Sequence, residues 1–382
     1  MDGVRITSLQ RILFLVTEDW YFASHRLPLA MEMARVGYMV SVATRVGRHR
    51  EHINRAGIRL IPFNLGRRFA NPIVELSILW RLIRLYRREQ PTVVYHVGLK
   101  PVVYGSLAAR IAGIAGQINA IAGLGSVFSS RRFKARLVRP LLQGVLRLLL
   151  AGRKSRIIVQ NRDDQRVVLE MMHQDPERVA VIAGAGVDLN QFAVTDEPAG
   201  TPVVLYAGRI LWDKGVGYFV EAARRLRSMG IAARFVLVGT PDEGNPSAVP
   251  LAQIENWQRA AIVEWWGQHD DMPAVFAASH MVCLPSYYGE GIPKVLIEAA
   301  ASGRAIVTTD IAGCREIVRH ETNGLLVCPH DVDALANALA RLIASPEERR
   351  RMGTAGRKIA EAEYGLELIN RQSLAVVEAV AA

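Results

Sequence analysis

Residues 279–318 read SHMVCLPSYYGEGIPKVLIEAAASGRAIVTTDIAGCREIV. The apolar run 281–284 is too short for a helix and predicts a buried strand. Pro293 suits the first position of a helix, where its missing N–H is not needed, and residues 294–302 are rich in the helix formers Ala and Leu. A second short strand is expected from residue 305. The stretch therefore predicts a strand, loop, helix, strand unit of an α/β domain.

The loop between this strand and helix is a candidate ligand site. Ligands of parallel sheets bind beyond the carboxyl ends of the strands. The free N–H groups at residues 292–295, with the helix dipole, favour a diphosphate. Glu290 and Glu298 flank the helix start, eight positions apart. Since carboxylates repel phosphate, we expect them to accept hydrogen bonds from sugar hydroxyls; the alternative is two glutamates that merely face water.

A second loop offers two cations. Residues 203–209, VVLYAGR, lead from an expected strand into a glycine turn, and Lys214 and Gly215 follow before another expected helix. Arg209 and Lys214 are five positions apart on this loop, so both can converge on one anion. Arg supplies a bidentate fork and Lys a point charge. The alternative is a pair of solvated basic residues.

Both halves of the chain alternate short apolar runs with longer amphipathic stretches. In the first half, the expected strands are residues 11–16, 39–44, 58–62, 92–96, 117–121, 156–160 and 179–182, and the expected helices are 25–36, 49–56, 72–89, 101–112, 133–150 and 162–172. In the second half, the strands are 203–207, 234–238, 262–265, 281–284, 305–308 and 325–327, and the helices are 216–228, 250–259, 272–278, 294–302, 332–343 and 346–363. This alternation predicts an α/β fold of two Rossmann-like, doubly wound domains. A Pro- and Gly-containing linker is expected at residues 192–202.

The bulk composition narrows the class of protein. With 382 residues, the chain is long enough for two domains of ordinary size. Its net charge of +11 indicates an anionic partner, such as nucleic acid, a phosphorylated substrate or acidic lipid. Cys283, Cys314 and Cys328 lie in or beside apolar runs and form no CxxC pair, so we expect reduced, buried and inert thiols. No secretory signal or stretch of transmembrane length is expected.

The second half resembles the family 4 retaining glycosyltransferases of the GT-B fold. Glu290, seven intervening residues and Glu298 match the EX7E motif of that family, and residues 284–318 are similar to its whole donor block. Arg209 and Lys214 match its R…K pair. The resemblance implies that Glu290 contacts the donor sugar and Glu298 the nucleotide ribose. It also implies that the two cations bind the donor diphosphate and stabilise the departing nucleoside diphosphate.

On this resemblance, the expected catalytic residues are Glu290, Arg209 and Lys214. The further expected donor contacts are Glu298, Gly291, Ile292, Pro293, Lys294, Gly208 and Gly239. The family retains the anomeric configuration without a metal, and the sequence carries neither a convincing DxD motif nor a zinc-spaced His/Cys cluster. We therefore expect no metal and no cofactor besides a UDP-sugar as co-substrate.

The first half resembles bacterial members of this family that act on polyprenyl-linked sugars. Residues 24–30, SHRLPLA, are similar to their acceptor-side segment, and residues 184–192 match the segment before their linker. The expected acceptor contacts are His25, Arg26, His96, Lys100, Gly123 and Gly125. Simpler roles are open: surface or capping positions for the histidines, and an ordinary tight turn for the glycines. Family members commonly place a sugar-contacting His near residues 119–123, and this chain has none there.

The resemblance also implies the domain limits and the reaction. We expect an acceptor-binding domain at 1–193, a nucleotide-sugar-binding domain at 194–365 that faces it across a cleft, and a C-terminal helix at 366–382 that crosses back to the first domain. The subgroup with the strongest resemblance transfers N-acetylgalactosamine to undecaprenyl-diphosphate-linked sugars. The expected donor is therefore a UDP-N-acetylhexosamine, and the expected location is the cytoplasmic face of a bacterial plasma membrane.

A basic stretch in the first half favours such a membrane surface. Between residues 131 and 156 there is no acidic residue, and apolar residues separate the basic ones. The basic residues are Arg131, Arg132, Lys134, Arg136, Arg139, Arg147, Arg153, Lys154 and Arg156. A basic amphipathic helix predicts attachment to anionic lipid, and the alternative is a core helix with a basic solvent face. This expected basic face extends to Trp80, Arg81, Arg84, Arg87 and Arg88.

Two other functions fit part of the sequence. A hydrolysing UDP-sugar 2-epimerase shares the two-domain architecture and would act on the sugar nucleotide without an acceptor. A non-catalytic basic module that binds membrane or nucleic acid would explain the charge. The four intact residues Arg209, Lys214, Glu290 and Glu298 argue against that module, and no nucleic-acid motif with interleaved aromatic residues is evident.

Overall fold

The computed structural model describes residues 10–67, 71–121, 123 and 143–382. The chain divides into two compact units: unit 1 comprises Met1–Ala185 and Glu367–Ala382, and unit 2 comprises Gly186–Leu366. The division falls after Ala185, before the expected limit at residue 193. Val187 explains this position, since its N–H donates to Tyr364 and its carbonyl oxygen accepts from Leu366, both at 2.9 Å.

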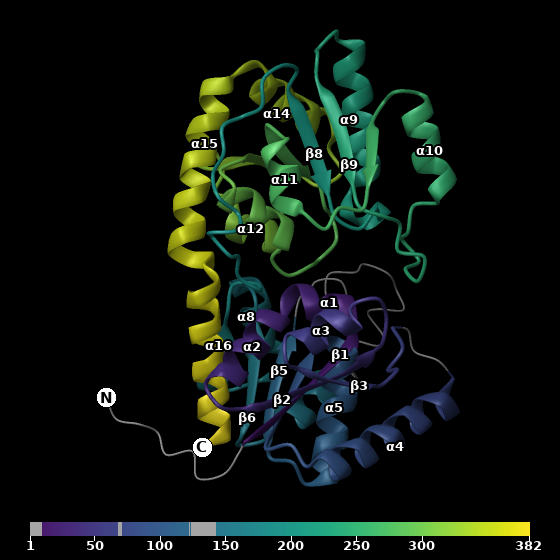
Figure 1. Ribbon diagram of the computed structural model, residues 1–382, viewed down its shortest axis with the longest axis vertical. Helices are drawn as coiled ribbons and strands as arrows, with labels where there is room; N and C mark the ends of the chain where they lie inside the picture. The colour runs from purple at the N-terminus through teal and green to yellow at the C-terminus, as the bar shows by residue number, and fades with distance from the viewer. Residues whose placement is uncertain (1–9, 68–70, 122, 124–142) are drawn as a thin grey trace. The chain divides into compact units, whose positions relative to one another are not determined.

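Unit 1 is built on a parallel seven-stranded sheet in the order β3-β2-β1-β4-β5-β6-β7 (Figure 1). The strands are β1 (Arg11–Glu18), β2 (Met39–Arg45), β3 (Arg59–Pro62), β4 (Val93–Val97), β5 (Gly116–Ile121), β6 (Ser155–Val159) and β7 (Val179–Val181). All seven strands expected from the sequence are present. β4 and β5 are buried along their whole length, as central strands of a parallel sheet are when helices cover both faces.

The helices of unit 1 cover both faces of its sheet. They are α1 (Asp19–His25), α2 (Leu27–Arg35), α3 (Arg50–Arg55), α4 (Pro72–Glu89), α5 (Leu99–Ala112), α8 (Arg162–Met172) and α16 (Leu366–Ala381), and residues 143–150 are also helical. One face of the sheet packs against α2 and α16. The other packs against α4 and α5. The short helix α1 was not predicted, since the first helix expected from the sequence begins at residue 25.

Helix α16 belongs to unit 1 although it ends the chain. Ile369, Val377 and Val380 are buried in the same apolar cluster as Phe14 of β1. The side-chain amide of Gln10 donates to the carbonyl oxygen of Ala381 at 3.4 Å. The chain therefore returns to its first unit after completing the second, and the apolar face of α16 accounts for the return.

Unit 2 has a parallel six-stranded sheet in the order β10-β9-β8-β11-β12-β13. Its strands are β8 (Val203–Ala207), β9 (Arg234–Val238), β10 (Glu264–Gly267), β11 (Met281–Leu284), β12 (Ala305–Thr309) and β13 (Gly324–Val327), each at or near its expected place. Its helices are α9 (Val216–Ser228), α10 (Leu251–Arg259), α11 (Met272–Ala277), α12 (Lys294–Ala301), α13 (Ala312–Ile317), α14 (Val332–Ala344) and α15 (Pro346–Ile359). The short helix α13 was not predicted. The two sheets agree with the expected pair of Rossmann-like domains. Cys283 and Cys314 are buried as expected, whereas Cys328, just after β13, is exposed.

Candidate active site

The strand order of unit 2 reverses between β8 and β11, which are neighbours in the sheet. Ligands of open α/β sheets bind beyond such a switch point. Gly208 and Arg209 follow β8, and residues 285–293 follow β11. The two loops that the sequence singled out therefore leave adjacent strands on the same edge of the sheet.

Lys214 and Glu290 meet at this edge. Nζ of Lys214 donates to Oε2 of Glu290 at 2.9 Å, and the two side chains are only 11% and 14% exposed. The hydroxyl of Ser286 donates to Oε1 of the same carboxylate at 2.8 Å. Both oxygens of Glu290 are thus held, one by a cation and one by a hydroxyl, so the largely buried carboxylate has a hydrogen-bond partner at each oxygen.

Backbone contact brings the lysine segment against the loop after β11. Gly215 has a φ of +79°, and a Cβ there would lie 1.9 Å from the carbonyl oxygen of Pro285. The N–H of Tyr287 donates to the carbonyl oxygen of Asp213 at 3.2 Å. Only glycine allows both this φ and this approach. The Lys214-Gly215 pair therefore positions the ammonium group beside Glu290.

Arg209 is held by a different loop. Its NH1 donates to Oδ2 of Asp242, after β9, at 3.0 Å. Gly239, with a φ of +128°, lies so close to Gly208 that a Cβ would approach the carbonyl oxygen of Gly208 to 1.9 Å. We expected Arg209 and Lys214 to share one anion. In the structure each cation instead pairs with its own carboxylate. The carboxylate balances the positive charge that a bound diphosphate is expected to balance.

Glu298 lies inside α12, one turn after Lys294. Nζ of Lys294 donates to Oε1 of Glu298 at 3.1 Å, the spacing that places two helical side chains on one face. Burial raises the pKa of the Glu298 carboxyl, and the positive charge of Lys294 opposes that rise. Glu298 and Glu290 thus have separate cationic partners.

The segment that leads into α12 is tightly packed. Pro293 is the residue before the helix rather than its first residue, and Ile292 is buried. A Cβ on Gly313 of α13 would lie 2.0 Å from the carbonyl oxygen of Gly291. Helix α13, which the sequence did not predict, therefore supports the expected donor loop directly.

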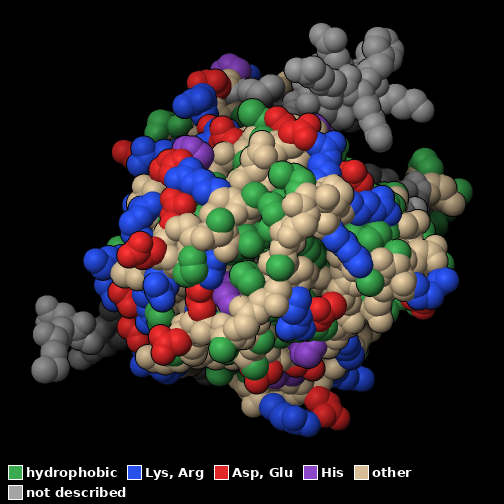
Figure 2. Space-filling view, turned by 90° about the horizontal axis from the view of Figure 1, so that it is seen from above, with side chains coloured by type: hydrophobic (Ala, Val, Ile, Leu, Met, Phe, Trp, Pro, Cys, Tyr) green, Lys and Arg blue, Asp and Glu red, His purple; other side chains and the backbone are tan. Residues whose placement is uncertain are grey.

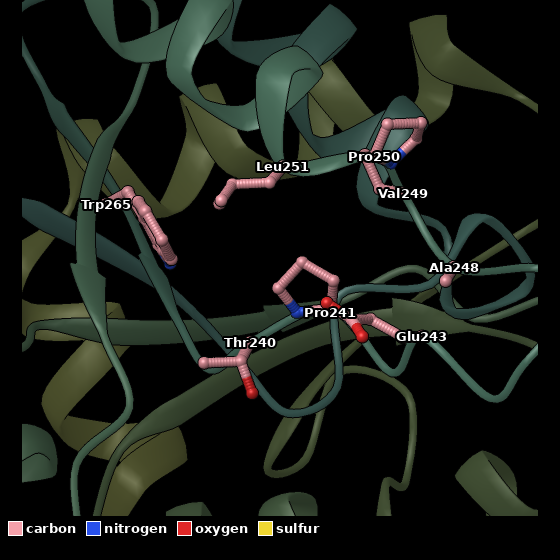
Figure 3. Close-up of a pocket in the computed structure, with 8 residues that line it drawn as sticks. All are labelled: Thr240, Pro241, Glu243, Ala248, Val249, Pro250, Leu251 and Trp265. Carbon is pink, nitrogen blue, oxygen red and sulfur yellow. The ribbon is translucent and has the colours of Figure 1, made fainter.

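A hollow of about 550 Å³ opens next to Gly239 (Figure 3). Its lining comes from the loop after β9, the start of α10 and the strand β10. Trp265, Leu251 and Pro241 surround the open space, and Nε1 of Trp265 donates to the carbonyl oxygen of Gly239 at 2.9 Å. Sequence reasoning missed this apolar wall. The Trp265-Trp266 pair on an edge strand was its only signal.

His96 of unit 1 is enclosed by side chains of its own unit, which argues against its expected role as an acceptor contact. The side chain is fully buried. Its Nδ1 lies 2.8 Å from Oδ1 of Asn119, and its Nε2 lies 3.0 Å from the hydroxyl of Tyr86. Ser106 also donates to Oδ1 of Asn119, so this oxygen is an acceptor and Nδ1 of His96 carries the proton. Burial lowers the pKa of His96 to about 4.

Lys100 and Arg26 are also buried. Nζ of Lys100 donates to Oε1 of Glu75 on α4 at 3.1 Å, so Lys100 is engaged within unit 1. Arg26, 3% exposed, stands at the junction of α1 and α2. His25 is half-buried and stacks on Tyr21, with ring centres 4.2 Å apart. Of these residues, only His25 keeps appreciable exposure.

The remaining acceptor and membrane predictions fall partly outside the described residues. Gly123 has a φ of +85°, as a tight turn needs, whereas Gly125 lies outside the described residues. So do the first five basic residues of the stretch 131–156. Within 143–150, Leu146 and Leu150 are buried in a cluster with β5 and β6, and Leu148 is exposed. This part of the stretch is thus a core helix whose outward face carries Arg147 beside the exposed apolar side chains of Val145 and Leu148.

A second hollow, of about 220 Å³, lies at the carboxyl ends of β1 and β2, and sequence reasoning missed it. Glu18 accepts hydrogen bonds from Arg45 at 2.9 Å and from Arg67 at 2.8 Å. Asp19 accepts from the N–H groups of Gly47 at 2.6 Å and His49 at 3.2 Å. The acidic pair that ends β1 therefore organises the loop after β2.

Each unit matches a known family. Residues 187–359 match the family described as glycosyl transferases group 1, and residues 11–161 match the family described as glycosyl transferase 4-like. The chain belongs to these glycosyltransferases. The two matched ranges cover six of the seven strands of the first sheet, all but β7, and all six strands of the second, so the assignment applies to unit 1 as well as to the candidate site in unit 2.

Two curated glycosyltransferases are similar to this one over much of their length. An N,N'-diacetylbacillosaminyl-diphospho-undecaprenol alpha-1,3-N-acetylgalactosaminyltransferase of Campylobacter jejuni is 26% identical over 97% of this chain and 99% of its own. A UDP-Gal:alpha-D-GlcNAc-diphosphoundecaprenol alpha-1,3-galactosyltransferase of Escherichia coli is 26% identical over 71% of each chain.

Solved structures share the fold of this glycosyltransferase. HepE of Anabaena in complex with UDP superposes with a TM-score of 0.76 at 19% identity, over 97% of this chain and 100% of its own. Sucrose-phosphate synthase from Thermosynechococcus elongatus gives 0.78 at 22% identity, over 97% and 98%. The likeness bears out the GT-B architecture expected from the sequence.

The described part of this glycosyltransferase contains neither a cluster of metal ligands nor a membrane-spanning helix. Among the described residues, no group of three or more His, Cys, Asp and Glu side chains is placed to hold a metal ion. No helix in the described ranges is long and apolar enough to cross a bilayer.

Proposed function

We propose that this glycosyltransferase moves a sugar from a UDP-sugar to a polyprenyl-diphosphate-linked saccharide, with retention of the anomeric configuration. The observation that carries the proposal is the cluster of Lys214, Glu290 and Ser286 at the switch point of unit 2. It combines a cation for a leaving diphosphate with a carboxylate that can accept sugar hydroxyls. The favoured donor sugar is an N-acetylhexosamine, with N-acetylgalactosamine first, as in the relative from C. jejuni.

The charges of the site suit departure of a nucleoside diphosphate. Negative charge grows on the diphosphate as the glycosidic bond breaks, and cations already aimed at that position lower the barrier. Lys214 and Arg209 each pair with a carboxylate of another loop, and a bound diphosphate would take the place of these carboxylates. The N-terminus of α12 adds N–H groups beside the same loop. Because these groups supply the positive charge, we propose that transfer requires no metal.

Glu290 and Glu298 have distinct proposed roles. Glu290 adjoins Lys214 and would hold hydroxyls of the donor sugar near the reacting carbon. Glu298, a turn deeper in α12 and partnered by Lys294, would accept from the ribose. The structure of HepE with UDP supports a uridine nucleotide as the donor carrier. The names of both curated relatives support a lipid-diphosphate acceptor and hence action at the inner face of the plasma membrane.

The test supplies purified protein with a panel of UDP- and GDP-sugars, with and without a polyprenyl-diphosphate-linked sugar, in EDTA. Mass spectrometry follows the lipid and the nucleotide, and proton NMR of the product reads the anomeric configuration. We expect one donor to extend the lipid by one α-linked sugar. The variant Glu290→Gln should lose this activity, whereas Glu264→Gln, which breaks a solvent-exposed pair with Arg234 on the same unit, should keep it.

Other products would overturn the proposal. Nucleotide release or an epimerised sugar without lipid extension would favour the 2-epimerase or a soluble acceptor. If transfer stopped in EDTA and returned with Mg²⁺, only the proposal that no metal is required would be overturned. Salt-sensitive nucleic-acid binding that Glu290→Gln leaves unchanged, without any transfer, would favour the non-catalytic basic module.

A further inference from the structure

Helix α4 of unit 1 exposes large apolar side chains. Ile73, Leu76 and Trp80 are 81%, 67% and 56% exposed, and Val74 beside them is also exposed. Large apolar residues at such exposure are ordinary when they stand alone. Several of them on one helix mark a surface that binds something.

These residues form one stripe along the helix. Positions 73, 76, 80, 84 and 87 are spaced by three or four residues, so they lie on one face. The buried residues Ile78, Leu82 and Leu85 occupy the opposite face and pack against the sheet. We call positions 73, 76, 80, 84 and 87 the α4 stripe. Its first half is apolar and its second half is arginine.

All exposed charged side chains of α4 are positive. Its exposed ionisable residues are Arg81, Arg84, Arg87 and Arg88. Its two acids are largely covered, and both are in ion pairs: Glu75 with Lys100, and Glu89 with Arg59 and Arg88. Figure 2 shows acidic and basic side chains interleaved across the face in view, so a helix with only arginines exposed departs from that mixture.

Local contacts keep the stripe in place and extend it. The guanidinium of Arg84 lies over the ring of Trp80, 4.3 Å from its centre, which leaves the cation and the indole side by side. Arg87 donates to the carbonyl oxygen of Ile111, a further exposed apolar residue at the end of α5. An indole next to cations suits the boundary between lipid headgroups and acyl chains.

We propose that the α4 stripe docks unit 1 on an anionic lipid bilayer. Ile73, Leu76 and Trp80 enter the headgroup boundary, while the arginines pair with lipid phosphates. The choice of a bilayer over a protein partner rests on the proposed function, because a polyprenyl-linked acceptor is itself held in a membrane. Charge complementarity supports it independently: the chain carries +11, and every exposed charge on α4 is positive.

Vesicle binding tests the docking surface without any substrate. Wild type is floated with vesicles of phosphatidylcholine alone and of phosphatidylcholine mixed with phosphatidylglycerol. The variant Ile73→Asp/Leu76→Asp should bind the anionic vesicles at least about tenfold more weakly. Both sites lie near the start of α4, where acidic side chains favour the helix dipole, so the fold should survive. Met229→Asp, at a residue of unit 2 that is 63% exposed, is the matched control and should bind as wild type does.

A second pair of variants separates charge from apolar insertion. Arg81→Gln/Arg84→Gln should weaken binding to anionic vesicles about tenfold at low salt and leave the weak binding to neutral vesicles unchanged. The control Arg224→Gln/Arg259→Gln removes two exposed arginines of unit 2. Vesicles with brominated acyl chains should quench tryptophan fluorescence in wild type, and Trp80→Phe should lose that quenching.

Three results would overturn the docking proposal. These are equal binding by wild type and Ile73→Asp/Leu76→Asp, equal binding to neutral and anionic vesicles, or a stripe-dependent self-association that rises with protein concentration and ignores lipid. Transfer to a detergent-dispersed acceptor is assayed separately and should be unchanged in the α4 variants. Failure of transfer in wild type, with vesicle binding intact, would count against the proposed function and leave the docking surface standing.

Discussion

Unit 1 and unit 2 share a parallel sheet but place their ionisable residues differently. In unit 2, Lys214 and Glu290 follow the ends of β8 and β11 and pair across two loops. In unit 1, His96 lies within β4 and is enclosed by Tyr86 and Asn119. A charged or polar residue that follows a strand end can contact a ligand. One inside a central strand has to find its hydrogen-bond partners within the core. The predictions below test that distinction, from the largest expected effect to the smallest.

Removal of the site lysine should have the largest effect. Lys214→Ala takes away the cation beside Glu290, so we expect turnover to fall by about 10³-fold, the usual scale for a group that stabilises transition-state charge. Lys358→Ala, at an exposed lysine of the same unit, is the control and should retain activity. Steady-state kinetics with saturating donor measures both.

A double variant sharpens this result. If Lys214 and Glu290 act as a unit, Lys214→Ala/Glu290→Gln should lose little more than either single variant. Losses that multiply would mean that the two residues act independently, and the ion pair would then be only structural.

Replacement of the glycine at the β9 end should destabilise unit 2. A Cβ at Gly239 would meet the carbonyl oxygen of Gly208 at 1.9 Å, with φ at +128°. We expect Gly239→Ala to lower the free energy of unfolding by about 3 kcal/mol. Gly230→Ala, where φ is +73° and no atom lies within 4 Å, should cost only about 1 kcal/mol. Urea unfolding compares them, and equal losses would contradict the close contact.

In unit 1, burial of His96 should make the free energy of unfolding depend on pH. The pKa of His96 falls from 6.5 to about 4 on burial, so the unfolded chain binds a proton at a higher pH than the folded one. The stabilisation is present above pH 6.5 and is lost as the pH falls toward 4. Between pH 7 and pH 5 we expect about 2 kcal/mol less free energy of unfolding from this group. Hydrogen exchange of β4 and β5 at the two pH values measures it.

The control for the histidine keeps its hydrogen-bonding ability and removes its titration. His96→Gln should be less stable at pH 7 but should lose less stability between pH 7 and pH 5. A variant with the same pH dependence as wild type would assign the effect to other groups.

The strands were predictable because each is a short apolar run between polar segments, as residues 281–284 illustrate. Short helices and helix breaks were harder to predict from the sequence. Helix α1 was not predicted, and the helix expected at residues 25–36 begins before the break at Arg26, where φ is −130°. Pro28, in the first turn of α2, was a local signal of that break. Helix α13 is too short to show an amphipathic period and contains Gly313, which is conformationally weak in a helix.

The candidate site also has a part that the sequence located and a part that it did not. Glu290, Glu298 and their loop are local in sequence, so spacing and turn residues located them. The partners of the cations are not local: Asp242 reaches Arg209 from the next strand, and nothing in either loop specifies that pairing. The enclosed environment of His96 was not predicted, because β4 is buried along its whole length and its pattern does not tell which residues lie at the ligand edge.

Two serines give the smallest effect and the closest comparison of the units. Ser286 donates to Glu290 at 2.8 Å, and Ser106 donates to Asn119 beside His96 at 2.9 Å. Ser286→Ala should lower turnover about tenfold, because one hydrogen bond to a charged group is removed, with little change in stability. Ser106→Ala leaves a buried acceptor short of a donor, so it should lower the free energy of unfolding by about 1 to 2 kcal/mol and leave turnover unchanged. Ser286→Thr, which keeps the hydroxyl, should recover activity if the hydrogen bond positions Glu290. If both alanine variants changed only stability, the cluster at Lys214 would be as structural as the one at His96, and the distinction between the two units would fail.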